Sequence, residues 1–148
     1  MRVSNPAISA LGTFRGLCGQ GLFLSTHLGT KRHVAVKVIM PQYMKEQEFV
    51  ERFRREAEAA GRLRHPNVVD VTDFGFASFN GQRIAYLVME YLDGCALDEI
   101  LEGGEMLPPE LALDIIKQTC SAVNDAHRQG IIHRDLKFGQ DSFRGRFL

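Results

Sequence analysis

The residues best suited to catalysis are concentrated in the stretch Ile131-Ile132-His133-Arg134-Asp135-Leu136-Lys137. Two β-branched apolar residues stand directly ahead of one carboxylate and two cations. Apolar anchors fix the backbone, so we expect Asp135 to project from a loop whose position is set. A carboxylate held in this way can orient a hydroxyl group and accept its proton. Lys137 shares that space as a cation able to hold phosphate oxygens.

The run His133-Arg134-Asp135-Leu136-Lys137 resembles the catalytic loop of eukaryotic-like protein kinases. The Leu-Lys pair after Asp135 is similar to the serine/threonine branch of that family. The resemblance implies Asp135 as the catalytic base and Lys137 as a phosphate clamp. It also implies ATP as the phosphoryl donor, a protein hydroxyl as the acceptor, and Mg²⁺ as the metal that the family uses.

The same resemblance implies an α+β fold. We expect a small lobe built from an antiparallel β-sheet and one long helix, followed by a hinge and the first helices of an incomplete helical large lobe. The expected segments are an N-terminal tail, the small lobe, the hinge with helices and catalytic loop, and a divergent tail, at residues 1–10, 11–91, 92–137 and 138–148.

Composition narrows the classes of partner. The 148 residues are 45% apolar, enough for a real core, and 18 basic residues balance 18 acidic ones. Nucleic acids and anionic membranes bind proteins that have an excess of basic residues, so neither is expected as the main partner. No apolar run approaches the length of a membrane span. Three scattered cysteines are typical of reduced thiols, which predicts a cytoplasmic protein.

A glycine-rich segment near the N-terminus predicts a phosphate-binding loop. Glycine permits positive φ angles and close approach, so backbone amides can face an anion. Gly16 and Gly21 match the kinase pattern Gly-x-Gly-x-x-Gly, while Cys18 replaces the middle glycine and Gly19 follows it. Phe23 stands where the family usually places a valine over the adenine. The alternative is a hairpin turn without a ligand.

A β-branched strand is predicted over residues 33–40. Its alternation places valines on one face (Val34, Val36, Val38) and Ala35, Lys37 and Ile39 on the other. A lysine among apolar neighbours is costly unless an anion meets it. By resemblance to the kinase Val-Ala-Ile-Lys strand, Ala35 faces the base and Lys37 the phosphates. The alternative is a lysine that reaches into solvent from an edge strand.

An amphipathic helix is predicted over residues 46–64. Its apolar face carries Phe49, Phe53, Ala60 and Leu63, and Glu56 lies within that face. A carboxylate among apolar side chains needs a cation. The resemblance implies that Glu56 pairs with Lys37. The alternative is a pair with Arg52 or Arg55 on the same helix.

Two short motifs follow this helix. His65-Pro66-Asn67 ends the helix, and His65 is expected to be a structural hydrogen-bonding residue. Asp73-Phe74-Gly75 spells the metal-binding motif of kinases, but it precedes the catalytic loop instead of following it. We therefore expect Asp73 not to bind magnesium. Asn80-Gly81 then predicts a tight hairpin.

The segment 87–94 passes from a buried strand to a turn and resembles the hinge between the kinase lobes. The resemblance implies that Met89 limits the back of the adenine pocket. Glu90 and Leu92 offer main-chain hydrogen bonds to the base edge. Ala96 cannot make the polar ribose contact of many relatives. Plain core packing is the alternative role for Met89.

A long helix is predicted over residues 109–129, opened by Pro108-Pro109 and closed by Gly130. The expected inner stripe is Ala112, Ile115, Ile116, Thr119, Val123 and Ala126. With few packing partners, this helix should expose apolar surface and favour association.

The resemblance ends after Lys137. Phe138 replaces the proline and Gln140 the asparagine of the kinase pattern, and no Asp-Phe-Gly follows. We therefore expect no protein ligand for magnesium in this chain. The surfaces that would read a protein substrate are also absent, so the sequence names no substrate.

Three functions remain open on the sequence. The first is an ATP-dependent serine/threonine protein kinase, weak or inactive on its own. The second is a kinase-like module that binds nucleotide or a partner without chemistry. The third is the product of a shifted or interrupted reading frame without an independent role. ATP binding separates the first two from the third, and phosphoryl transfer separates the first from the second.

Overall fold

The computed structural model describes residues 8–10, 21–39, 44, 46–79, 81–94, 97–104, 106–134, 136, 141–142 and 146–147. They belong to two compact units, which are treated separately. The first takes the residues up to Arg62 together with Asp70–Tyr91. The second takes Leu63–Val69 together with the residues from Leu92 onward. No helix in the described ranges is long and apolar enough to cross a membrane.

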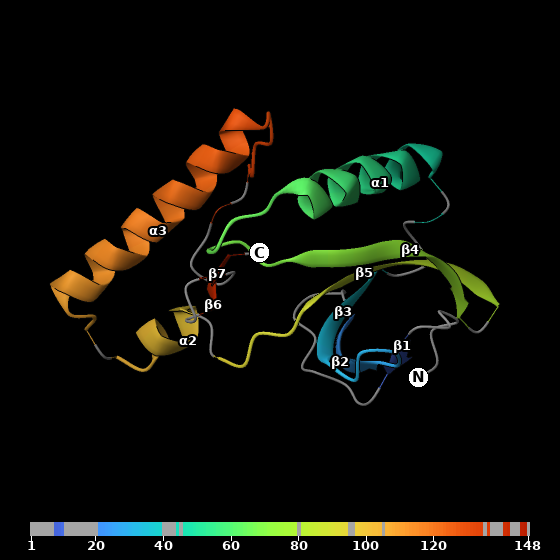
Figure 1. Cartoon of the computed structure of the whole chain (residues 1–148), viewed down its shortest axis with the longest axis horizontal. Helices are drawn as coiled ribbons and strands as arrows, with labels where there is room; N and C mark the ends of the chain where they lie inside the picture. Colours follow the sequence, from blue (N-terminus) through green and yellow to red (C-terminus); the bar gives the residue numbers. More distant parts are fainter. Residues whose placement is uncertain are drawn as a thin grey trace. The chain divides into compact units, whose positions relative to one another are not determined.

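The first unit is built on a five-stranded antiparallel sheet (Figure 1). Its strands are β1 (Ile8–Ala10), β2 (Gly21–His27), β3 (His33–Ile39), β4 (Val71–Phe79) and β5 (Gln82–Glu90). Their order across the sheet is β1-β2-β3-β5-β4. The antiparallel sheet and the long helix beside it confirm the predicted small-lobe architecture.

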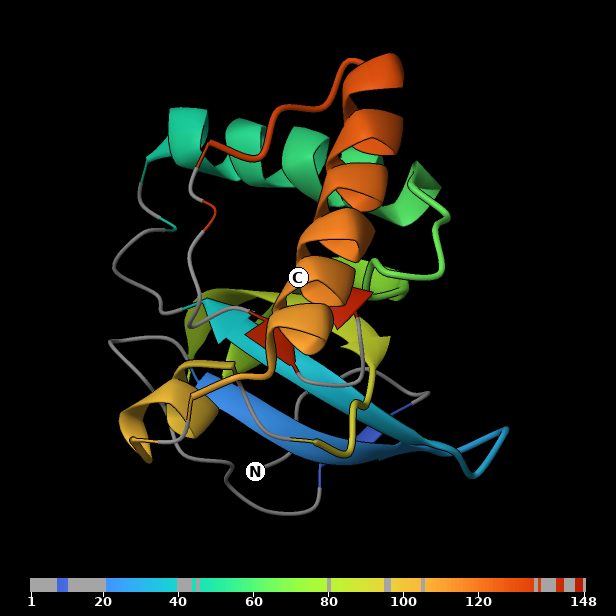
Figure 2. The ribbon, with the colours of Figure 1, turned by 90° about the vertical axis from the view of Figure 1, so that its left-hand side faces the viewer.

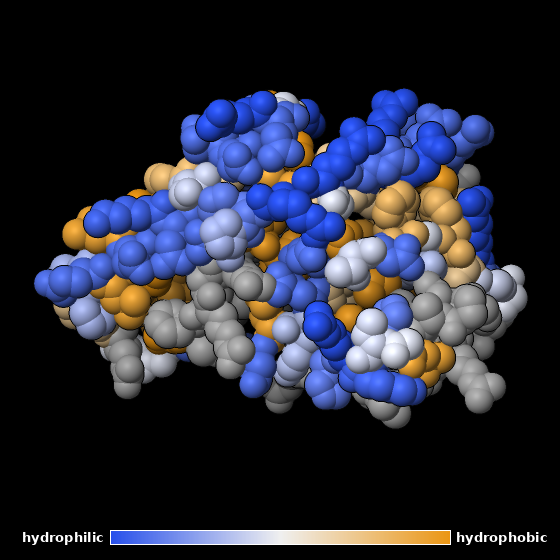
Figure 3. Space-filling view, viewed as in Figure 1, coloured by the Kyte–Doolittle hydropathy of each residue, from blue (hydrophilic) through white to orange (hydrophobic). Residues whose placement is uncertain are grey.

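Helix α1 (Gln47–Arg62) covers one face of this sheet, as Figures 1 and 2 both show. The apolar cluster beneath it consists of Met44, Phe53, Ala57 and Ala85, with Ile39, Phe49, Val50, Phe74, Phe76 and Leu87 packed against them. The ring of Phe53 meets the rings of Phe74 and Phe76 edge to face. The surface of α1 seen in Figure 3 is mainly hydrophilic, as expected of an amphipathic helix.

The opposite face, here called the outer face, holds a second apolar cluster. It consists of Val34, Val36, Val38, Ile84, Tyr86 and Val88, with Phe23 and Ala77 packed against them. The three valines of β3 therefore lie on one face and Ile39 on the other. This division confirms the predicted alternation of the strand.

Strand β4 accounts for the misplaced Asp-Phe-Gly motif. Phe74 packs beneath α1, while the Asp73 carboxylate accepts a hydrogen bond from the backbone N–H of Phe74. A Cβ atom on Gly75 would lie 2.6 Å from the Tyr86 hydroxyl oxygen, so the Tyr86 side chain requires a glycine there. Packing and hydrogen bonding within the sheet therefore explain why Asp73, Phe74 and Gly75 occur in this strand.

The second unit contains α2 (Leu97–Glu102), α3 (Pro109–Arg128) and two short paired strands, β6 (Asp141–Ser142) and β7 (Arg146–Phe147). The paired strands lie within residues 138–148, which were predicted as a divergent tail. Exposed apolar side chains lie on α2 and α3 and on the segments after each helix, at Leu101, Met106, Leu113, Ile116, Ile132 and Leu136.

The predicted inner stripe of α3 is wrong at one position. Ile116 is 56% exposed, whereas Ala122, which was left out of the stripe, is 4% exposed. The two residues lie on opposite edges of the apolar stripe, so a small rotation of the helix exchanges them. Asn67 donates a hydrogen bond to Gln118, which lies beside Ala122 on the helix surface. This contact accounts for the buried edge.

The turn at residues 65–67 attaches to α3 by side-chain hydrogen bonds. The two ring nitrogens of His65 bond to the Ser121 hydroxyl at 3.0 Å and to the backbone N–H of Asn67 at 3.1 Å. The structural role predicted for His65 is thus confirmed.

Candidate functional site

The candidate site begins on the sheet face that α1 partly covers. Directly paired residues of neighbouring antiparallel strands share a face, and such a set is called a row here. One row contains Leu24, Ala35, Met89 and Val71; the next contains Leu22, Lys37, Leu87 and Phe74. Leu87 and Phe74 belong to the cluster beneath α1. Lys37 therefore lies between the helix-covered end of this face and the row of Ala35 and Met89.

Lys37 is the only cation in these two rows. Burial lowers the pKa of its amine from the usual value of 10.5, because removal from water disfavours the charged form. Among the described residues no carboxylate forms an ion pair with it. A half-buried ammonium in this position gains most from an anion of suitable size, such as a phosphate group.

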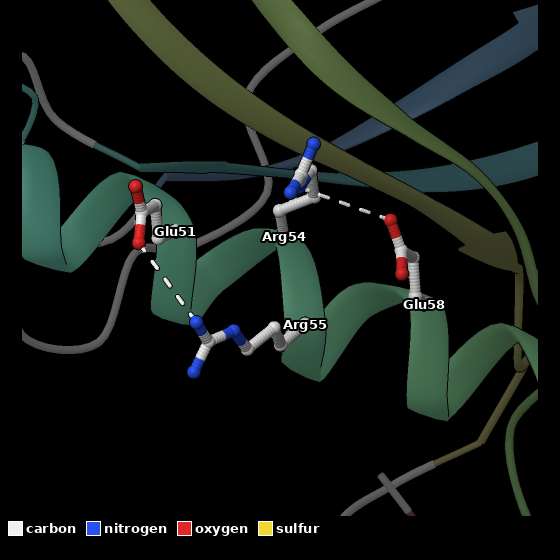
Figure 4. Close-up of polar contacts among 4 residues, drawn as sticks. All are labelled: Glu51, Arg54, Arg55 and Glu58. Atoms are coloured by element: carbon white, nitrogen blue, oxygen red, sulfur yellow. Dashed lines mark ion pairs between the residues drawn. The ribbon is translucent and has the colours of Figure 1, made fainter.

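The predicted pair between Lys37 and Glu56 is not formed in the structure. Glu56 is exposed, and the ion pairs along α1 join Arg54 to Glu58 and Arg55 to Glu51, each at 3.9 Å (Figure 4). The alternative pairs of Glu56 with Arg52 or Arg55 are not formed either.

The helical wheel explains this correction. The residues of α1 that are buried are Phe53 and Ala57, with Val50 packed beside them. Ala57 and Val50 lie on the far side of Phe53 from Glu56 and turn the stripe away from the carboxylate. Glu56 therefore lies on the flank of the apolar face instead of its centre. It remains on the helix that covers the face carrying Lys37.

The position predicted for Phe23 is also wrong. Phe23 pairs with Val36 and packs against the outer-face cluster, so it lies on the side of the sheet opposite Ala35 and Lys37. The residues of β2 that share the face of Lys37 are Leu22 and Leu24. Sequence reasoning missed both, since it took the position in β2 from the family pattern. The signal that could have found them is the length of the hairpin that joins β2 to β3.

The end of β5 fixes the start of the predicted hinge. Glu90 and Asp70 are joined twice. The Glu90 N–H donates to the Asp70 carbonyl at 3.0 Å, and the Asp70 N–H donates to the Glu90 carboxylate at 2.8 Å. Met89, just before, is 2% exposed. The Glu90 N–H is thus engaged, and a contact of this residue with a base edge has to use its carbonyl oxygen.

The catalytic-loop part of the site begins where α3 ends. Gly130 has φ 76°, its N–H donates to the His127 carbonyl, and the Ile131 N–H donates to the Ala126 carbonyl. This is the Schellman arrangement that ends a helix with a left-handed glycine. It confirms the predicted helix stop and fixes the direction in which the loop leaves α3.

Arg134 is the last described residue ahead of the predicted base. Its φ of 66° lies in the left-handed region, which non-glycine residues rarely adopt, so the backbone turns sharply there. Asp135 and Lys137 lie outside the described residues, as do Gly16, Cys18 and Gly19 of the glycine loop. Leu92 is described and half-buried, after the end of β5.

The described residues do not fit a magnesium site. No three His, Cys, Asp or Glu side chains gather within the ranges that the structure describes. Asp73, the aspartate of the Asp-Phe-Gly triplet, lies in β4. We therefore assign no chemical step to a metal ion.

The comparison with protein families decides the relationship. Residues 14–139 match the family model described as protein kinase domain. The chain belongs to the protein kinase family. This kinase chain is also similar in structure to the Mycobacterium tuberculosis PknI kinase domain, with a TM-score of 0.80 and 28% identity over 93% of this chain and 56% of that one.

Bacterial relatives indicate the serine/threonine branch of the family. The chain is 40% identical over 128 residues to the serine/threonine-protein kinase PknB of Mycobacterium leprae, a match that covers 86% of this chain and 21% of that protein. It is 40% identical over 116 residues to the serine/threonine-protein kinase PrkC of Bacillus subtilis, covering 78% of this chain and 17% of that protein. The kinase chain thus spans about a fifth of the length of these relatives.

Proposed function

We propose that this chain binds ATP on the sheet face of Lys37 and transfers its terminal phosphate to serine or threonine hydroxyls of a protein. The observation that carries the proposal is the environment of Lys37. Its amine is half-buried among apolar side chains, and none of the described carboxylates pairs with it. An anionic ligand offsets the cost of that burial.

The row beside Lys37 suits the flat base of the nucleotide. Ala35 is small, so it leaves room for a ring above the sheet, and Met89 next to it limits the depth of that room. Glu90 and Leu92 supply main-chain groups for the base edge, Glu90 through its carbonyl. Gly16, Cys18, Gly19 and Gly21 form the proposed loop over the phosphates.

Asp135 is the proposed base of the transfer step. Its carboxylate accepts the proton of the substrate hydroxyl as the hydroxyl oxygen bonds to the γ-phosphorus. The bond from that phosphorus to the bridging oxygen breaks, and the electron pair leaves with ADP. Lys137 holds the oxygens of the transferred phosphoryl group. The fixed end of α3 and the sharp turn at Arg134 support a rigid approach to Asp135.

The proposal also covers compartment and partners. An exposed thiol at Cys120 fits a reducing compartment, so we place the protein in the cytoplasm. The partners are ATP and a protein substrate, with neither nucleic acid nor membrane as the main partner. Association of copies through exposed apolar side chains of α3, such as Leu113 and Ile116, is testable by light scattering.

The test separates binding from transfer. Calorimetric titration with ATP, with and without Mg²⁺, should show saturable binding that Lys37→Met weakens by at least about tenfold. Radiolabelled phosphate should then appear on a generic basic protein and be lost in Asp135→Asn. Absence of ATP binding by the unmodified chain would overturn the proposal.

A second function is favoured by one observation. Glu56 is exposed and does not pair with Lys37. A module that binds nucleotide without transfer fits this arrangement. Saturable ATP binding with no label transferred, and no difference between the chain and its Asp135→Asn variant, would decide for that module.

A further inference from the structure

The two edges of the sheet differ in length and in protection. Strand β1 ends the sheet on one side with three residues, whereas β4 ends it on the other side with nine. An edge strand leaves N–H and C=O groups unpaired, and proteins usually shorten such a strand or place charges, prolines or bulges on it. In β4 the bulge between Val71 and Asp73 disturbs only the start. The remaining residues, 74–79, contain neither a charged residue nor a proline.

The pairing of β4 with β5 shows which backbone groups face this free edge. Two residues separate Phe79 from its partner Gln82, and Gly81 between them has φ 75°. A two-residue turn of this kind closes on a hydrogen-bonded pair. Hydrogen-bonded and non-hydrogen-bonded pairs alternate along antiparallel strands. The residues whose N–H and C=O groups point away from β5 are therefore Phe74, Phe76 and Ser78.

A side-chain contact agrees with this assignment. The N–H of Phe74 donates to the Asp73 carboxylate at 2.8 Å, so it is directed away from the ladder with β5. Within the part of the chain that the structure describes, no other strand or loop bonds to the outward groups of Phe76 and Ser78. Two consecutive outward positions are thus open to a further strand.

One cation lies beside these positions. Arg83 of β5 pairs with Ser78, and its guanidinium lies 4.6 Å from the centre of the Phe76 ring. Arg83 is exposed, and it forms no ion pair with a carboxylate of the described residues. Phe76 packs beneath α1, so the guanidinium lies on that side of β4. A strand added beside β4 would direct every second side chain to the same side, within reach of Arg83.

We propose that the free edge of β4 binds an extended segment of another protein as an additional strand, and that an acidic side chain of this segment pairs with Arg83. Main-chain hydrogen bonds to Phe76 and Ser78 supply affinity, and Arg83 selects the carboxylate. These three residues belong to neither of the two rows at Lys37. The inference therefore goes beyond the proposed function and does not depend on nucleotide binding.

The charges favour this partner over a second copy of the chain. Two copies of β4 that pair antiparallel about Phe76 would bring their Arg83 guanidinium groups together across the two-fold axis. Like charges in that position repel, and residues 74–79 offer no carboxylate to separate them. A segment with an acidic residue removes the repulsion and gives Arg83 a partner.

A labelled peptide tests the edge. The probe has eight residues that alternate valine and threonine, with one glutamate in place of a central valine. Fluorescence anisotropy with the full chain should show saturable binding, and exchange of the glutamate for lysine should weaken it at least about threefold. Arg83→Glu should reverse the order of the two peptides. Circular dichroism checks that each variant is folded.

A proline on β4 tests the backbone contact. Ser78→Pro removes an outward N–H and leaves the ladder with β5 in place, because proline is tolerated on the solvent side of an edge strand. It should raise the Kd for the glutamate peptide at least about fivefold, whereas the control Ser78→Thr, which keeps the N–H, should change that Kd less than about twofold. If Ser78→Pro does not fold, methylation of alternate peptide nitrogens replaces it. One alternate set should abolish binding and the other should leave it intact.

Four results would overturn the inference. The first is no binding of the glutamate peptide by the unmodified chain up to about 1 mM. The second is an equal affinity of the two peptides for the unmodified chain and for Arg83→Glu. The third is an equal effect of both methylation patterns. The fourth is dimerisation in sedimentation velocity that Ser78→Pro abolishes, because a second copy would then occupy the edge.

Discussion

The two faces of the sheet are made from the same strands but differ in the side chains that they carry. The buried part of the outer face is apolar apart from Ser25, and Ile84, Val36, Val38 and Val88 there are each at most 2% exposed. The face toward α1 interrupts its apolar side chains with Lys37, and its second half leaves Leu22 and Leu24 half-buried. The outer face is closely packed, whereas the face toward α1 is less closely packed and carries the charge of Lys37.

This difference shows where to look for function in a small sheet. A closed apolar cluster contributes stability and needs no ligand. A face that holds an ammonium group without a carboxylate partner carries a cost that an anionic ligand would offset. The first three predictions below test this difference between the faces, and the last tests the solvent side of α1.

The largest expected loss of stability comes from a substitution on the outer face. Ile84→Ala should lower the free energy of unfolding by about 2–5 kcal/mol, because it removes a 1% exposed side chain and leaves a cavity. Leu22→Ala on the other face should cost less than half as much, since that residue is half-buried. Denaturant unfolding of both variants checks this, and equal losses would contradict the contrast between the faces.

The next effect concerns a glycine of the outer face. Gly75→Ala should destabilise the chain by about 1–3 kcal/mol, because the new methyl group would lie 2.6 Å from the Tyr86 hydroxyl oxygen. Gly61→Ala in α1 is the control, since its methyl group would meet only the Val71 carbonyl at 3.9 Å. That change should stabilise the helix by up to about 1 kcal/mol. Thermal unfolding midpoints that move in the same direction for both variants would contradict the packing described.

The third prediction tests the charge on the other face through pH. Burial lowers the pKa of Lys37 below its usual value of 10.5. Between the lowered folded pKa and 10.5 the unfolded state binds more protons, so stability should rise with pH in that window. Below the window the cost of the buried charge is fully present.

Lys37→Met removes this contribution, so the unmodified chain should gain stability relative to Lys37→Met as the pH rises toward 10.5. Unfolding midpoints of both proteins across the alkaline range check the sign. Lys31→Met, on the exposed hairpin, is the control for the loss of a lysine from the surface. A relative loss of stability on raising the pH would contradict the burial of Lys37.

The smallest effect is expected on the solvent side of α1. Glu58→Gln should change the free energy of unfolding by less than about 0.5 kcal/mol, because the pair with Arg54 is exposed and 3.9 Å long. Added salt should reduce even this difference. A loss above about 1 kcal/mol in denaturant unfolding would show that this surface belongs to a packed interface.

Much of the fold follows from the sequence, because local patterns decide it. The alternation of β3, the hairpin between β4 and β5 and the stop of the long helix at Gly130 depend on residues close in sequence. Each of these features has a physical reason that acts within a few residues.

The errors arise where small rotations or shifts decide the outcome. Glu56 and Ile116 lie at the edges of apolar stripes, and neighbours elsewhere in the fold determine which edge is buried. Phe23 depends on the register between β2 and β3, and a difference of one residue in their hairpin moves every side chain to the other face. Periodicity does not determine these details, because they depend on contacts between separate elements.

The double link between Asp70 and Glu90 has a consequence for hydrogen exchange. Both amide protons are engaged at the point where the chain leaves the sheet, so their deuterium uptake should slow together and report one local opening event. Glu90→Gln replaces the charged acceptor and should speed uptake at Asp70 more than at Glu90. A nucleotide held by the following residues would suppress that opening, so exchange at Asp70 can register occupancy without a label on the ligand.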